Sequence, residues 1–106
     1  MDKRVRAFID EELYPMIVTP IEKHIKPNMT IQEKFIAKQD VFLEIKELVN
    51  GAKIFTELSV EEIIETIKNI MEKRKELHEG SSLQYELVTN ILDEIMKQDK
   101  EEEKSI

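Results

Sequence analysis

Apolar residues recur every three or four positions through most of this chain of 106 residues. This spacing is the repeat of an amphipathic α-helix, and residues that start or stop helices divide it into stretches. Thr30 and Ser59 each precede such a stretch, with Glu33 and Glu62 three positions later, which is the capping-box pattern. Because the chain has only two glycines and three prolines, turn-rich β architectures are excluded. The sequence therefore predicts an all-α fold.

The periodic stretches define four main helices, which we expect over residues 2–14, 31–49, 60–78 and 82–98. Only two or three residues join the last two of these helices, so they should form an antiparallel hairpin. We expect all four to pack in one compact antiparallel bundle. We expect a single helical domain over residues 1–98. Residues 99–106 are almost all charged, and we expect them to form a disordered tail.

Prolines and glycines set the expected helix ends. Pro15 should end the first helix, because proline lacks an amide hydrogen and disfavours the helical conformation in the residue before it. A short additional helix is then expected near residues 20–26, with Thr19 as its cap. Gly51 should end the second main helix in the left-handed conformation. The pattern leaves residues 52–58 undecided between helix, loop and extended chain.

The composition excludes the usual chemistries of small enzymes. There is no cysteine, so thiol nucleophiles, disulfides and zinc–thiolate sites are absent. Two glycines are too few for a loop that cradles phosphate groups. His24 and His78 are the only histidines in the sequence, and neither has a second metal ligand at a suitable spacing. We therefore expect a protein that is not an enzyme, with no catalytic residue, cofactor or bound metal.

The hydropathy pattern argues against a membrane protein. The longest uncharged apolar stretch covers residues 13–21 and is interrupted by prolines. It is much shorter than the roughly 20 residues that a membrane-spanning helix needs. The start of the chain is basic, but acidic residues follow before a signal-peptide core could form. Together with the absence of cysteine, this predicts a cytoplasmic location.

The formal net charge of −7 is unevenly distributed along the chain. Residues 1–53 carry nine basic and nine acidic side chains, whereas residues 54–106 carry seven basic and fourteen acidic ones. An acidic surface on the last two main helices would attract a basic protein partner. The predicted partner-binding residues are Glu61, Glu65, Glu72, Glu86 and Glu94.

The helix expected at 31–49 is apolar over more of its surface than the neighbours in a small bundle would cover. One line of residues along this helix, which we call the seam, has successive spacings of 4, 3, 4, 3 and 4 positions, as in helices that pair with one another. The seam consists of Ile31, Phe35, Lys38, Phe42, Ile45 and Val49. A single compact bundle and a homodimer both explain this pattern, and we favour the homodimer. The expected self-contact lies in and just after the first helix, at Phe8, Leu13, Tyr14 and Met16.

These features favour a small protein–protein interaction module: a regulator, adaptor, chaperone or inhibitor that presents an acidic helical face or an apolar groove to its partner. One alternative is a nucleic-acid-associated accessory protein that uses the basic residues Lys3, Arg4 and Arg6, although the acidic balance argues against nucleic acid as a partner. A second alternative is a divalent-metal-dependent nucleotide hydrolase that uses Glu61 and Glu65, which share one helix face.

Overall fold

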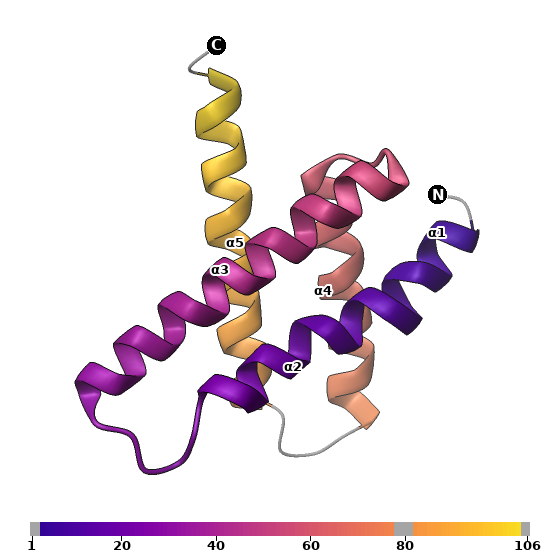
Figure 1. Ribbon diagram of the computed structural model, residues 1–106. Helices are drawn as coiled ribbons and strands as arrows, with labels where there is room; N and C mark the ends of the chain where they lie inside the picture. Colours follow the sequence, from indigo (N-terminus) through magenta and orange to yellow (C-terminus); the bar gives the residue numbers. More distant parts are fainter. Residues whose placement is uncertain (1–2, 78–81, 105–106) are drawn as a thin grey trace.

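The computed structural model describes residues 3–77 and 82–104, and within them the chain forms helices joined by short connections (Figure 1). The elements in chain order are α1 (Lys3–Phe8), the π-helical segment η1 (Ile9–Leu13), α2 (Tyr14–His24), α3 (Ile31–Thr56), α4 (Val60–Leu77) and α5 (Ser82–Lys104). None of the described residues is in a strand. The predicted all-α bundle is confirmed, while His78 at the expected end of the third main helix lies outside the described residues.

The helices are arranged as two crossed pairs in two layers (Figure 1). The continuous rod made of α1, η1 and α2 packs against α3, which runs in the opposite direction. Behind this pair, α4 and α5 form a second antiparallel pair whose axes cross the first. The molecule is accordingly flat, with extents of 41 × 38 × 18 Å. A thickness of 18 Å is about that of two stacked helices.

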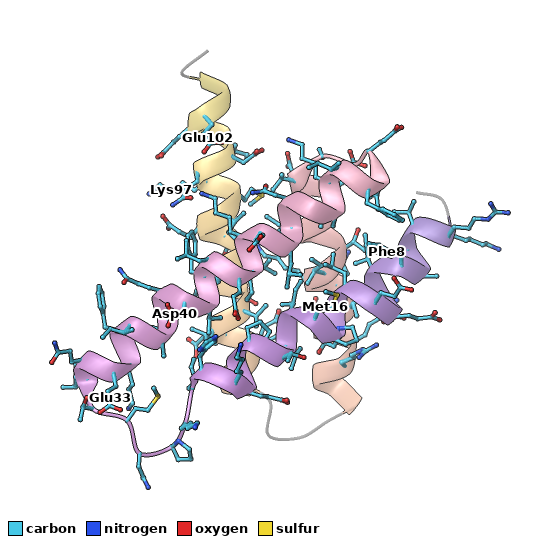
Figure 2. The ribbon with its side chains drawn as sticks, viewed as in Figure 1. Phe8, Met16, Glu33, Asp40, Lys97 and Glu102 are labelled. Atoms are coloured by element: carbon cyan, nitrogen blue, oxygen red, sulfur yellow. The ribbon has the colours of Figure 1, made fainter. Side chains whose placement is uncertain are left out.

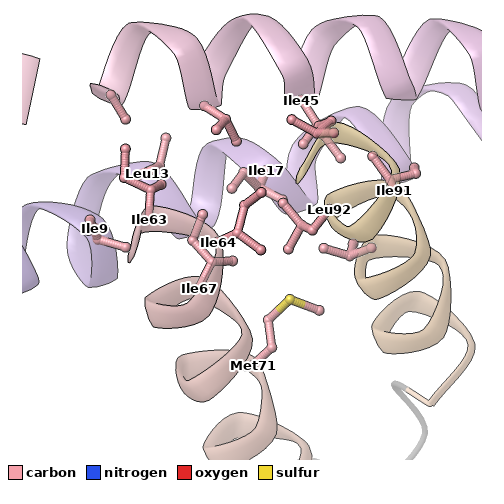
Figure 3. Close-up of a cluster of buried hydrophobic side chains, with 14 of the residues drawn as sticks. Ile9, Leu13, Ile17, Ile45, Ile63, Ile64, Ile67, Met71, Ile91 and Leu92 are labelled. Carbon is pink, nitrogen blue, oxygen red and sulfur yellow. The ribbon is translucent and has the colours of Figure 1, made fainter. Parts of the chain in front are cut away.

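The core lies where the two pairs cross, and isoleucine dominates it (Figure 3). Ile17 of α2, Ile45 of α3 and Ile67 of α4 are fully buried, at 0% exposure, and so is Leu92 of α5. Every layer therefore contributes large apolar side chains to one contiguous cluster. Because the core is closely packed, the removal of even one methylene group from it lowers the free energy of unfolding.

The prediction that Pro15 ends a helix was wrong, because the rod made of α1, η1 and α2 continues through this proline. The Tyr14 amide donates to the Ile9 carbonyl across a π turn, so the helix widens by one residue just before the proline and continues to His24. Thr19, expected as a cap, lies inside the helix and donates its hydroxyl to the Pro15 carbonyl at 2.8 Å. The short helix expected near residues 20–26 is therefore the last part of α2.

Two predicted helix starts are confirmed in detail. The Glu33 amide donates to Thr30 Oγ1 at 3.2 Å, and the Thr30 hydroxyl donates to Glu33 Oε1 at 3.1 Å. Ser59 and Glu62 make the same pair of contacts, at 3.1 and 3.0 Å. Each hydroxyl thus satisfies an amide that has no partner within the helix, so α3 and α4 begin where the capping pattern placed them.

The predicted end of the second main helix was wrong, because α3 continues through Gly51 to Thr56. Ala52 is only 4% exposed, so the buried face of the helix extends beyond the glycine and packing favours continuation. The left-handed residue that ends the helix is Glu57, with φ of 59°. Most of the undecided segment 52–58 is therefore helical.

The last helix extends through residues 99–104, where we expected a disordered tail. Two contacts with α3 hold the start of this segment. Lys46 Nζ donates to Gln98 Oε1 at 2.9 Å, and Lys53 Nζ lies 3.9 Å from an Asp99 carboxylate oxygen. These contacts join residues about fifty positions apart, so the local charge pattern of the tail could not indicate them.

Candidate functional site

Three of the four residues expected to make a self-contact are used inside the chain. Leu13 is 3% exposed and belongs to the core, which corrects its assignment to a free surface. The Phe8 ring stacks on Phe55 of α3, with centroids 5.0 Å apart and an interplanar angle of 25°. The Tyr14 ring is covered by a guanidinium group from α4. Of these four residues, only Met16 on α2 remains open to solvent, at 50% exposure (Figure 2).

Arg74 of α4 is the residue that covers Tyr14, with its guanidinium carbon 4.2 Å from the ring centroid. Its Nη2 also donates to Asp10 Oδ1 at 2.7 Å. Both partners lie at the π turn, so one arginine attaches the first rod to α4 through a cation–π contact and an ion pair. The sequence contains no signal for this contact because Arg74 is at least sixty positions from both partners. Its role is structural.

The acidic residues predicted to bind a partner are all exposed: Glu61, Glu65, Glu72, Glu86 and Glu94. They do not form one surface. Glu61 and Glu65 line a hollow of about 320 Å³ together with Lys68, which pairs with Asp93 across the α4–α5 contact. Glu94 lies on the side of α5 that faces α3. Binding through these carboxylates remains a prediction, and the ammonium group of Lys68 weakens the negative potential around the first pair.

The two alternative functions gain no support from the geometry. Among the described residues, no group of three or more His, Asp or Glu side chains is placed to hold a metal ion, so Glu61 and Glu65 have no further ligand. Lys3, Arg4 and Arg6 are exposed on α1, the first element of the chain. Nucleic-acid binding through them stays a prediction.

A groove between α3 and α5 has a volume of about 610 Å³ and a mostly apolar lining. Phe42, Leu87 and Ile91 supply its more buried apolar side chains. Phe35 and Leu43 also line it and are 62% and 61% exposed. The polar residues that line the groove are Lys38, Gln39, Asn90 and Glu94. The groove thus combines an apolar surface with a few polar groups of both charge signs, which is the usual composition of a binding site.

The start of α3, residues 31–40, projects beyond the crossing pair, as the positions of Glu33 and Asp40 show (Figure 2). Every residue of this segment except Ala37 is exposed. Ile31 is 89% exposed and Ile36 is 51% exposed, so this segment carries exposed apolar side chains in addition to those that line the groove. We call Ile31, Phe35, Ile36 and Leu43 the α3 apolar face.

The predicted seam of α3 is divided by the fold. Ile45 and Val49 are fully buried, whereas Ile31 and Phe35 are open to solvent. The expectation that this helix is more apolar than its own chain covers agrees with these exposures. The sequence could not show which part would be covered, because that depends on where α4 and α5 cross α3.

Comparison of the chain with models of protein families, with curated proteins and with solved structures finds no match. In residues 3–77 and 82–104, no helix has both the length and the apolar character needed to cross a bilayer.

Proposed function

We propose that this protein is a small protein–protein interaction module that binds its partner in the α3–α5 groove and along the α3 apolar face. The observation that supports this is the exposure of four large apolar side chains on one helix, beside a groove of about 610 Å³. Patches of this kind on a small protein are typical of surfaces that bind other proteins. The proposed binding site is therefore the groove and not the acidic residues, which are divided between separate surfaces.

The binding mode that fits an elongated apolar groove between two helices is the insertion of a partner helix. Phe35 and Leu43, both on the α3 wall of the groove, would contact that helix and become buried. Complete burial of such a side chain contributes about 1.5–3 kcal/mol, so two of them could act as the main binding determinants. Lys38 and Glu94 at the edge of the groove would set the orientation of the partner through their opposite charges.

The proposal is tested by photo-crosslinking in the native cell. A photoreactive phenylalanine analogue at Gln39, which lines the groove, should give a crosslinked product heavier than the 12.5 kDa chain. The same analogue at Asn50, exposed on the same helix but outside the groove, is the matched control and should give none. Absence of any product from position 39 would contradict the proposed function, whatever the other positions show.

A further inference from the structure

The α3–α5 groove and the α3 apolar face leave large apolar side chains exposed. We infer that what covers them is the same surface of a second copy of the chain, with the two α3 helices packed antiparallel about a twofold axis. This inference rests on the proposed function and names its partner. It also moves the self-contact from the first helix, where Leu13 is buried, to α3.

The spacing of the α3 seam is the first argument. Ile31, Phe35, Lys38 and Phe42 are four, three and four positions apart, which is the spacing of a helix that packs along another helix. The same seam continues into the core at Ile45, where the chain supplies its own partner helices. At the start of the seam the chain leaves Ile31 89% and Phe35 62% exposed. A second α3 has the matching seam to cover them.

The charge of this segment is the second argument. The whole chain carries −7, so two copies repel each other over most of their surfaces. Residues 31–43 are neutral, because Glu33 and Asp40 balance Lys34 and Lys38. The start of α3 is therefore a surface on which two copies meet without net repulsion between the facing segments.

The groove also has self-complementary charges. Lys38 lies on α3 and Glu94 on α5, and neither makes an ion pair with any residue that the structure describes. In a dimer with a twofold axis, the same patch of each copy faces the other. Lys38 of each copy can then contact Glu94 of the other copy, which gives two equivalent ion pairs. A partner of uniform charge would leave one of these groups opposed by a like charge.

The geometry of the segment supplies the third argument. Gln39 is midway between Phe35 and Leu43, so a twofold axis beside it sets Phe35 of one copy next to Leu43 of the other. The projecting segment is about 15 Å long and would extend over the second molecule. The four exposed side chains of the two copies together present on the order of 1,000 Å², which reaches the lower limit for a specific interface.

The test is the mass of the intact protein in solution, measured by light scattering and by sedimentation. We expect twice the chain mass of 12.5 kDa, and the mass of a single chain for Phe35→Glu and for Leu43→Glu. Ile54→Glu is the matched control: Ile54 is 82% exposed on the same helix but outside the groove, so this variant should keep the double mass. Circular dichroism checks that each variant remains helical.

A second measurement locates the axis. The chain has no cysteine, so Gln39→Cys introduces a single thiol, and mild oxidation should link two copies through it. Asn50→Cys should stay unlinked. A single-chain mass for the wild type, or a double mass that persists in both Phe35→Glu and Leu43→Glu, would overturn the inference. In either case, a crosslinked product in the cell between position 39 and a different protein would still support the proposed function. If position 39 gave no product at all, both the proposed function and this inference would be contradicted.

Discussion

The helix α4 and the start of α3 have similar apolar periodicity and opposite surroundings. In α4, six apolar residues are at most 7% exposed: Val60, Ile63, Ile64, Ile67, Ile70 and Met71. At the start of α3, Ile31, Phe35 and Ile36 are at least 51% exposed. Apolar periodicity therefore predicts a helix and its apolar side, while the crossing of the two layers decides which part of that side is covered. An apolar side that the fold leaves open is available for binding.

The largest expected effect comes from shortening a side chain in the covered helix. Ile67→Ala should lower the free energy of unfolding by about 2–5 kcal/mol, because it leaves a cavity between the two layers. Phe35→Ala, compared in the background of Leu43→Glu so that self-association does not contribute, should change it by about 0.5 kcal/mol or less. Chemical denaturation measures both. Equal losses for the two variants would show that the start of α3 is packed after all.

The contact that helps to cover α4 gives the next largest effect. Arg74→Ala should lower the free energy of unfolding by about 1 kcal/mol, because it removes an exposed cation–π contact with Tyr14 and a partly exposed ion pair with Asp10. Arg74→Lys is the control that keeps the charge but loses the planar group, and it should recover only part of the loss. Thermal unfolding at low and high salt separates the two components, since salt weakens only the ion pair strongly.

The two capping boxes extend the comparison to the helix starts. Ser59→Ala should lower the free energy of unfolding by about 1 kcal/mol, because it removes the cap of a helix that begins in the core at Val60. Thr30→Ala removes the same bond from the projecting end of α3, and the end can fray without exposing the core. We therefore expect a smaller loss in global unfolding and faster amide exchange over residues 31–36. The opposite order of the two losses would contradict this reading of α3.

The parts of the fold that could be predicted are those with local causes. The starts of α3 and α4 depend on hydroxyl and carboxylate groups three residues apart, so Thr30 and Ser59 mark them correctly. The prediction that Pro15 ends a helix was wrong because a π turn accommodates this proline. Asp10 and Tyr14 in that turn contact a distant arginine. Such long-range contacts have no signature in a single sequence.

The same distinction applies to the candidate site. The seam of α3 identified a helix with an excess of apolar surface, and this excess is present at Ile31 and Phe35. The contribution of Leu87 and Ile91 from α5 could not be predicted, because it requires the crossing of α5 over α3. Leu13 was wrong as a surface residue for a related reason, because η1 ends with this side chain in the core.

The smallest expected effect is a gain. Gly51 lies inside α3, where glycine disfavours the helix, and a Cβ atom at this position would meet nothing within 4 Å. Gly51→Ala should therefore raise the free energy of unfolding by about 0.5–1 kcal/mol, without a change in the mass in solution. Equilibrium denaturation measures the gain, and Gly51→Pro, which cannot donate an amide hydrogen, should instead destabilise the protein. If Gly51→Ala were destabilising, α3 would end near Asn50, and the apolar residues Ile54 and Phe55 would belong to the connection to α4 and not to the helix.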